Sequence, residues 1–271
     1  MLRESPVGMA GAALVLFWVG VALAAPWLAP FDPNATLAPF SPPGTPYVGG
    51  GTFWLGTDHI GRDILSRVIW GSRTVLTYGP LATGCAYAVG VVLGLAAGYR
   101  RGWLDEVLSR FSDFVLSFPV IVLYILIIST YGASGINVIL AVTFASAPAV
   151  MRLVRSLTLE LAELDFVAAA RMRGESAWFV MFAEILPNVR GPLVVDSCLR
   201  LGYVIITIGV LGFLGLGLPP PDPDWGGMVN ETRAMAMVFP HMALYPCLAI
   251  SSLVLGLNLL ADGVREISLD G

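Results

Sequence analysis

The chain has 271 residues, of which 56% are hydrophobic and only 13% are charged, and its formal net charge is −4. Soluble globular domains are about 25% charged, so this composition excludes an ordinary soluble domain and indicates a protein that spans a membrane. All 15 basic residues are arginine. A P-loop nucleotide site needs a lysine that reaches the phosphates, so this chain cannot form such a site by itself.

Six segments are apolar enough and long enough to cross a bilayer as helices, which takes about 20 residues each. The stretch 114–151 is long enough for two spans, and the turn-forming residues 131–135 divide it. We therefore predict an all-α membrane protein with six transmembrane helices, which lie within residues 5–31, 74–99, 114–131, 135–151, 192–214 and 239–261.

The arginines predict how the chain is inserted, because basic residues are enriched in cytoplasmic loops. If both termini are cytoplasmic, ten arginines lie inside and only four lie outside, and Arg200 falls within the fifth span. We therefore predict that the N-terminus and the C-terminus are cytoplasmic. The chain then divides into a transmembrane helix at 1–31, an external segment at 32–73, and a five-helix core at 74–271 that includes the cytoplasmic loop 158–190.

The external segment contains two pairs of acidic and basic residues four positions apart, Asp58 with Arg62 and Asp63 with Arg67. Such pairs stabilise a helix, and the apolar residues among them fall on one face, which predicts an amphipathic helix on the outer membrane surface. Two interpretations remain open. The helix is a platform or gate at which a partner protein docks, or it covers the bundle as a structural lid. Trp225, in a proline-rich loop, has the same two interpretations and is also a residue type that anchors at membrane interfaces.

Asp196 and Arg200 form a similar pair inside the fifth predicted span. Ionisable side chains within spans usually face a bundle interior or a water-filled cavity. The pair therefore either lines a path for a solute or is an ion pair near the cytoplasmic end of the span. The three cysteines are far apart and there are only two histidines, so we expect no metal site and no cofactor bound by this chain.

The cytoplasmic loop predicts a helical hairpin. Asp165 is the expected N-cap of a first helix, which the alanines 168–170 favour, and Gly174 suits the left-handed residue that follows a helix end. A second helix begins at Glu175 or Ser176 and ends at Pro187. Its aromatic residues, which we expect to pack against the spans, are Trp178, Phe179 and Phe182. The hairpin is either an ordinary cap on the bundle or a surface on which another protein docks.

This loop resembles the signature loop of the permeases of binding-protein-dependent ABC importers, which reads Glu-Ala-Ala, three residues, Gly, and a later Leu-Pro. The matching residues here are Ala169, Ala170, Gly174, Leu186 and Pro187. Ala168 stands in place of the usual glutamate, and Glu184 stands where the peptide-importing branch often has histidine. In that family the loop forms a coupling helix that docks on the ATPase subunit. The resemblance implies that docking here involves Phe166, Ala168, Ala169, Ala170, Arg171, Arg173, Gly174 and Glu175.

Further motifs, in the same order along the chain, resemble the dipeptide, oligopeptide and nickel branch of this family; they lie at residues 29–33, 55–67, 213–217, 224–226 and 258–265. The resemblance implies a type I importer permease fold and a place in a bacterial inner membrane, with the external segment in the periplasm. It also implies half of a translocation pore for short peptides. Nickel, glutathione or another small solute remains an alternative cargo.

The same resemblance implies four kinds of partner besides membrane lipid, and no nucleic acid. These are a second, related permease, two ATPase subunits that bind ATP and magnesium, and a periplasmic or lipid-anchored solute-binding protein. The chain itself is then not an enzyme, because the transport ATPase activity lies in the partner subunits.

Two other classes of protein remain as distant alternatives. Ser134, in a Gly-x-Ser-Gly stretch, and His241 in the sixth span are the residue types of a rhomboid-like intramembrane serine protease, which would require hydrogen-bond contact between them. A self-contained ion-coupled transporter would need carboxylates near mid-span and usually internal repeats, and Asp196 is the one candidate carboxylate.

Overall fold

Helices make up most of the protein in the computed structural model, which describes residues 5–219 and 221–270. The first half of the chain contains α1 (Pro6–Leu23), α2 (Ala25–Leu28), β1 (Thr45–Pro46), β2 (Thr52–Phe53), α3 (Ile64–Arg100), α4 (Gly102–Leu116) and α5 (Val120–Tyr131). The second half contains α6 (Gly135–Leu161), α7 (Asp165–Met172), α8 (Ala177–Phe179), the π-helix η2 (Val180–Ile185), α9 (Leu186–Phe213), α10 (Trp225–Thr232), the 3₁₀ helix η3 (Arg233–Met235) and α11 (His241–Asp270).

Five helical segments of the described chain are long and apolar enough to cross a membrane. A sixth span results if α4 and α5, which meet at a bend of 88°, are counted as one broken crossing. The predicted all-α architecture with six spans is therefore confirmed. The continuous crossings are Pro6–Leu23, Ile64–Arg100, Gly135–Leu161, Ala177–Phe213 and His241–Glu266.

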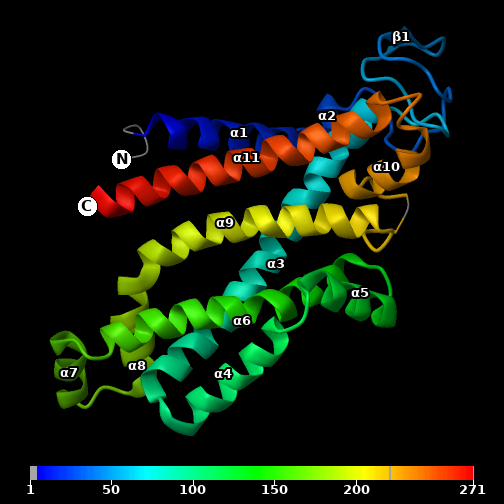
Figure 1. Ribbon diagram of the computed structural model, residues 1–271. Coiled ribbons are helices and arrows are strands. Elements are labelled where there is room, and N and C mark those ends of the chain that lie inside the picture. The colour runs from blue at the N-terminus through cyan, green and yellow to red at the C-terminus, as the bar shows by residue number, and fades with distance from the viewer. Residues whose placement is uncertain (1–4, 220, 271) are drawn as a thin grey trace.

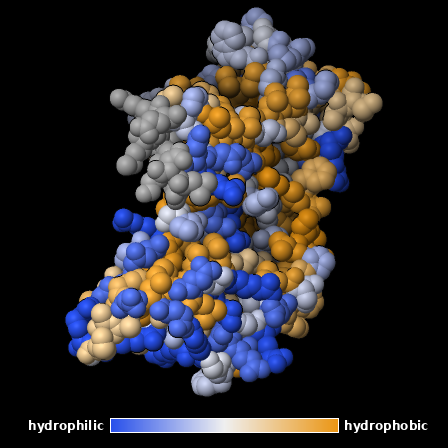
Figure 2. Space-filling model, turned by 60° about the vertical axis from the view of Figure 1, so that its left-hand side comes forward, coloured by the Kyte–Doolittle hydropathy of each residue, from blue (hydrophilic) through white to orange (hydrophobic). Residues whose placement is uncertain are grey.

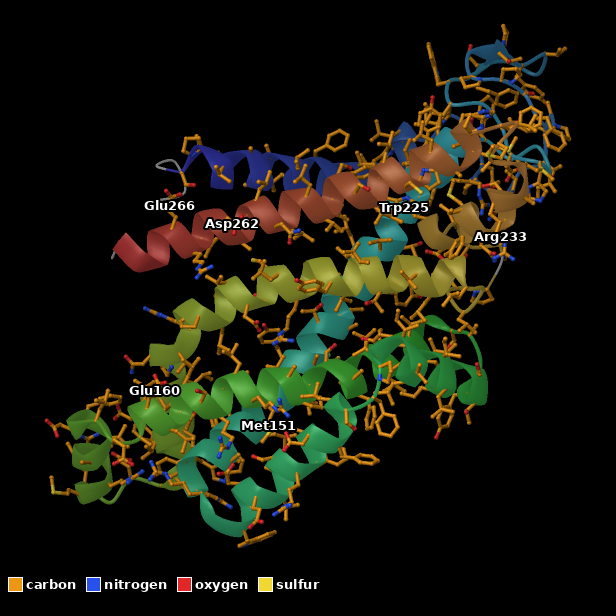
Figure 3. All side chains as sticks on the ribbon, in the orientation of Figure 1. Met151, Glu160, Trp225, Arg233, Asp262 and Glu266 are labelled. Atoms are coloured by element: carbon orange, nitrogen blue, oxygen red, sulfur yellow. The ribbon has the colours of Figure 1, made fainter. Side chains whose placement is uncertain are left out.

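The loops and termini gather at two opposite ends of the molecule (Figure 1). One end, called here the α7 end, carries α7 together with the start of α1 and the end of α11. The other, called the α10 end, carries β1, β2 and α10. Glu160, Asp262 and Glu266 lie toward the α7 end, whereas Trp225 and Arg233 lie at the α10 end (Figure 3). Hydrophilic residues are concentrated in the lower part of the molecule in Figure 2, with apolar residues among them, and an apolar surface runs along the right side above them.

Glycines bring α3 and α6 into direct backbone contact. Gly90, Gly94 and Gly98 are four residues apart and therefore lie on one face of α3. A Cβ atom at Gly94 would lie 2.6 Å from Cβ of Val154 and 2.7 Å from the carbonyl oxygen of Met151, and the other two glycines are equally confined. In lipid, where apolar side chains gain little by leaving the solvent, close packing through small residues is a main source of helix association. This face of α3 therefore holds the central helix pair together.

The first helix is fixed to the last one in the same way. A Cβ atom at Gly11 of α1 would lie 2.7 Å from the carbonyl oxygen of Gly256 in α11. Trp18 Nε1 donates a hydrogen bond of 3.0 Å to Ser252 Oγ, and the Trp18 ring meets the Trp225 ring edge-on at 5.0 Å between centroids. The segment 5–31 is therefore packed against the bundle, and the two helices lie side by side in Figure 1.

The amphipathic helix predicted around Asp58 and Arg67 is wrong. Residues 58–63 form a turn, in which Gly61 has φ +92° and Thr57 pairs with Asp63 as an isolated bridge. Asp58 Oδ1 accepts the backbone N–H groups of Ile60 and Arg62, which is how a short polar side chain stabilises a turn instead of a helix. Asp63 is the N-cap of α3, and the residues after it belong to the membrane-spanning helix itself.

Three further predictions about the helices also differ from the structure. The second span begins at Ile64, ten residues earlier than predicted, because its arginines are paired or stacked at the α10 end. The third is broken next to Pro119, which has no N–H to donate and disfavours a helical residue before it. Pro187 does not end the second helix of the hairpin, because it lies in the first turn of α9, where the missing N–H costs little, and the helical segment runs on to Phe213.

Candidate functional site

The first candidate site is the hairpin formed by α7 and the start of the next helical segment. Asp165 is the first residue of α7 and not its N-cap, a position that Leu164 occupies without a side-chain hydrogen bond. Gly174 has φ +78°, and its N–H donates to Arg171 O, while Glu175 N–H donates to Ala170 O. These two bonds form a Schellman motif, so the predicted helix end at Gly174 is confirmed. Ser176 Oγ accepts the N–H of Phe179 and caps the next helix.

The two faces of α7 differ. Val167 and Ala170 are fully buried and pack in one cluster with Val180, Met181 and Ile185 of the following helix. Ala168, Arg171 and Met172 are exposed, and Phe166 and Ala169 are half-buried. The alanine in place of the usual glutamate therefore presents a small, uncharged surface to any partner at this end of the molecule.

The aromatic residues of the hairpin do not pack against the spans, contrary to the sequence-based prediction. Trp178 is 55% exposed, and its ring stacks on that of Phe182 at 5.6 Å, while Phe179 is 44% exposed. The π-helical turn η2 changes which side chains of this segment point toward the bundle. The aliphatic residues Val180, Met181 and Ile185 make the contact. Arg173 Nη2 pairs with Glu184 Oε1 at 2.9 Å, so the residue in place of the usual histidine closes the hairpin.

The second candidate site is a network of charged residues at the α10 end. Asp58 Oδ2 accepts a hydrogen bond of 2.6 Å from Arg62 Nε, and Arg62 also pairs with Glu231 of α10. Arg67 Nη2 lies 3.8 Å from the same Glu231 carboxylate, and its Nη1 donates to Pro33 O at 3.2 Å. The network therefore joins the loop 32–63, the start of α3 and α10.

These side chains are not themselves available to a docking protein. Asp58, Arg62, Asp63 and Arg67 are all less than 7% exposed. Trp225 is fully buried, and its Nε1 donates to Val68 O at 2.9 Å. A charged or amphipathic side chain at this depth positions the backbone around it, so a partner at this end would contact the loops that the network holds.

The third candidate site contains the pair inside the fifth span. Asp196 Oδ2 accepts a hydrogen bond of 2.6 Å from Arg200 Nε, and it also accepts one from the Tyr87 hydroxyl of α3. Arg200 lines a groove of ≈ 320 Å³ between the broken helix α4–α5, α6 and α9. Sequence reasoning found the pair but missed Tyr87, which lies more than 100 residues earlier in the chain.

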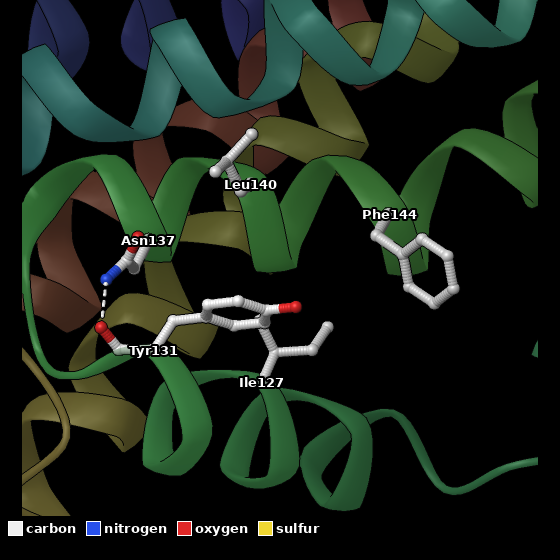
Figure 4. Close-up of a pocket in the computed structure, with 5 residues that line it drawn as sticks. All are labelled: Ile127, Tyr131, Asn137, Leu140 and Phe144. Atoms are coloured by element: carbon white, nitrogen blue, oxygen red, sulfur yellow. Dashed lines mark hydrogen bonds between the residues drawn. The ribbon is translucent and has the colours of Figure 1, made fainter.

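A larger cavity of ≈ 550 Å³ lies between α5 and α6 and is almost entirely apolar (Figure 4). It is lined by Ile127, Tyr131, Asn137, Leu140 and Phe144. The side-chain amide of Asn137 donates to Tyr131 O at 3.0 Å and to Gly132 O at 2.8 Å, so it fixes the connection between the helices. This cavity offers a polar solute little to bind, in contrast to the groove beside Arg200.

Comparisons with known proteins agree on one family. Residues 90–268 match the family described as the inner membrane component of binding-protein-dependent transport systems, and residues 1–43 match the N-terminal transmembrane domain of oligopeptide transport permease C. The chain belongs to the permeases of binding-protein-dependent ABC importers. Together the two matches identify a permease of the dipeptide and oligopeptide branch, as the sequence motifs indicated.

Relatives of this permease cover almost its whole length. It is 39% identical over 96% of its residues to the glutathione transport system permease protein GsiD of Pectobacterium atrosepticum, covering 85% of that protein. The corresponding protein of Escherichia coli is 40% identical over 97% of this permease and 86% of its own length. The solved structure of the MetNI methionine ABC transporter, in an inward-facing conformation, has the same fold with a TM-score of 0.60 and 18% identity, covering 76% of this permease and 96% of that chain.

Membership in this family excludes the intramembrane protease. In this permease Ser134 Oγ accepts the N–H of Asn137 as the N-cap of α6. His241 is the first residue of α11 and lies beside Gly56. Its Nε2 is 3.0 Å from the position that a Cβ atom on Gly56 would take. The serine therefore begins a helix, and neither residue has a catalytic arrangement.

Removing the Arg62 side chain is expected to release the loop 32–63 of the permease. Arg62→Ala leaves the Asp58 carboxylate buried without its cation and deprives Glu231 of its closest partner. Breaking a buried ion pair costs about 3–5 kcal/mol, and since Glu231 is partly exposed we expect about 2–3 kcal/mol. Thermal unfolding in detergent and limited proteolysis within 32–63 measure the effect.

Arg73→Ala, which removes an exposed arginine that stacks on Trp70, is the matched control. Equal stability of the two variants would contradict the role of the network.

The stability of the permease is expected to depend on the protonation of Asp224. Burial raises the pKa of this carboxyl to about 6, although it accepts the backbone N–H groups of Gly226 and Gly227. Because the native pKa lies above the ordinary value of 3.8, the contribution of Asp224 to stability is greatest below about pH 4 and is lost as the pH rises through about 6. The difference of about two pH units corresponds to at most about 3 kcal/mol.

Asp224→Asn tests this dependence, because asparagine keeps an acceptor at the N-cap of α10 but does not titrate. We expect the difference in melting temperature between pH 4.5 and pH 7.5 to shrink in this variant. Asp224→Ala does not titrate either but also removes the cap, so it is expected to be about 1 kcal/mol less stable than Asp224→Asn at both pH values. An unchanged pH dependence in Asp224→Asn would show that other groups cause it.

Proposed function

We propose that this permease forms half of the pore of an ATP-driven importer for short peptides, with glutathione as the first candidate cargo. The peptide branch of the family and the 39–40% identity to glutathione permeases support this choice over nickel. A second, related permease completes the pore. Two ATPase subunits, which bind ATP and magnesium, supply the energy, and a periplasmic or lipid-anchored solute-binding protein delivers the cargo.

The observation that carries the proposal is the hairpin at the α7 end. It presents Ala168, Arg171 and the apolar Met172 of α7 outward, and it is built into the helical segment that continues as α9. We propose that α7 is the coupling helix, that its exposed face docks on an ATPase, and that the α7 end and both termini are cytoplasmic. The ten arginines that this orientation leaves on the cytoplasmic side support it. The α10 end then faces the periplasm, and the loop 32–63 together with the neighbouring α10 receives the solute-binding protein.

The test is uptake by the whole importer in proteoliposomes. The permease is reconstituted with its partner permease, both ATPases and the cognate binding protein, and uptake of radiolabelled glutathione is measured with and without ATP. We expect ATP-dependent uptake that unlabelled glutathione and short peptides compete for and nickel chloride does not. Uptake of nickel without competition by peptides would instead support the alternative cargo. Uptake that continues without the ATPases would overturn the importer mechanism.

A further inference from the structure

The guanidinium of Arg200 is held in one orientation while part of it stays available. Its Nε donates to Asp196 Oδ2 at 2.6 Å, and the same oxygen accepts the hydroxyl of Tyr87 from α3. The Tyr87 hydroxyl is also a hydrogen-bond partner of the Arg200 side chain, so one edge of the guanidinium contacts both Asp196 and Tyr87. These two residues therefore fix the direction of the guanidinium, whose remaining edge lines the groove and can bind a planar anion.

That remaining edge belongs to a groove that is large enough for part of a small solute. The groove encloses ≈ 320 Å³, at the lower limit of pockets that hold small ligands. Four hydroxyl-bearing residues line it besides Arg200, namely Tyr124, Ser146, Tyr203 and Thr207. A hydroxyl both donates and accepts, so these groups suit amide and carboxylate groups whose positions vary from solute to solute.

The depth of the groove indicates that it faces water and not lipid. Arg200 lies 13 residues before the end of α9 at Phe213, which is about 20 Å along a helix and within the hydrocarbon thickness of about 30 Å. Its side chain is 24% exposed, and the neighbouring Tyr203 is 70% exposed. An arginine that faced lipid at this depth would cost at least about 2.5 kcal/mol. A partly exposed ion pair at this place is therefore expected on the wall of a hydrated path.

We propose that Arg200 and this groove form a binding site for the carboxylate of the transported solute, an inference that rests on the proposed import of short peptides. Guanidinium and carboxylate match as two parallel hydrogen bonds, and every short peptide carries at least one carboxylate. The groove thus binds the carboxylate that all short peptides have and does not select among their side chains. The negative charge of Asp196 weakens the attraction, which allows the solute to leave again.

Uptake by the reconstituted importer tests the site. Arg200→Gln is expected to lower glutathione uptake at least tenfold, while ATPase activity stimulated by the binding protein stays within about twofold of wild type. Arg200→Lys keeps the charge but loses the planar pair of donors, so its glutathione uptake should lie between that of wild type and that of Arg200→Gln. Arg110→Gln, which removes an exposed arginine of α4 outside the groove, is the matched control. Equal uptake by wild type and Arg200→Gln would overturn the proposal.

Chemical labelling tests the same site without transport. In a variant whose three cysteines are replaced by serine, Thr207→Cys places one thiol in the groove. We expect a negatively charged methanethiosulfonate reagent to react at least fivefold faster than a positively charged one, and this preference should disappear when Arg200→Gln is added. Glutathione at saturating concentration should slow the reaction.

The two experiments separate the groove from the cargo. If the wild-type importer carries neither glutathione nor peptides, the proposed function fails, but the anionic preference at Thr207→Cys still decides whether the groove attracts anions. If peptides are imported and both reagents label the groove equally fast, the proposal for Arg200 fails alone.

Discussion

An arginine at Ala168 is expected to abolish binding of the ATPase subunits while the membrane domain stays folded. Ala168 is exposed on α7, so a long side chain there meets solvent in the isolated permease. In a docked complex it would bury a charge without a partner, which costs several kcal/mol, and each 1.4 kcal/mol is a factor of ten in affinity. Co-purification of the ATPases with tagged permease should fall more than tenfold, with an unchanged elution volume of the permease alone.

Three further substitutions sharpen this result. Ala168→Ser keeps the surface small and should retain the ATPases. Ala169→Arg and Gly174→Arg should lose them, and Gly174→Arg also strains the backbone, because φ +78° is unfavourable for a side chain by about 1 kcal/mol. No contact fills the space where a side chain at Gly174 would begin, so the fold is expected to survive. ATPases that co-purify at wild-type levels with the arginine variants would exclude α7 as the docking element.

A leucine at Gly94 is expected to prevent the permease from folding. The first side-chain atom would already lie 2.6 Å from Val154 Cβ and 2.7 Å from Met151 O, both of which belong to the rigid body of α6. The helices can only separate, and the contacts on either side through Gly90 and Gly98 separate with them. We expect Gly94→Leu to yield no monodisperse protein in detergent and Gly94→Ala to lower the melting temperature by several degrees.

Gly84→Ala is the matched control on the same helix. No atom lies within 4 Å of the position of its Cβ, and alanine is favoured over glycine within a helix by about 0.8–1 kcal/mol. This variant should therefore be at least as stable as wild type. If Gly94→Leu were to fold with a wild-type melting temperature, the close contact between α3 and α6 would not be needed for the fold.

Local patterns in the sequence predicted the helical architecture and the hairpin end well. Gly174 and Ser176 act through hydrogen bonds to residues within five positions, so their roles follow from nearby sequence alone. The hydrophobic lengths likewise gave six spans. The regular spacing of Gly90, Gly94 and Gly98 is a signal of a close helix contact that charge and hydrophobic length do not carry.

Contacts between distant segments account for what was missed. The local spacing of the external arginines predicts a surface helix, because the partner that holds them in the structure, Glu231, comes more than 160 residues later. Trp225 was expected at the surface because its contacts with Trp18 and Val68 depend on three separate helices. The groove beside Arg200 could not be predicted, since α4, α5, α6 and α9 all contribute to its wall.

The permease can bend most easily in the segment between α8 and the middle of α9. Within 13 residues, Val180 to Pro192, the backbone contains the π-helical turn η2, the junction with α9 at Pro187 and a proline inside α9. The π-helical turn and the internal proline each weaken or remove regular helix hydrogen bonds. Bending there costs less than bending the α3–α6 pair, whose backbones are in contact. A hinge at this place would let α7 tilt the long arm of α9, and with it the guanidinium of Arg200, while the rest of the bundle stays still.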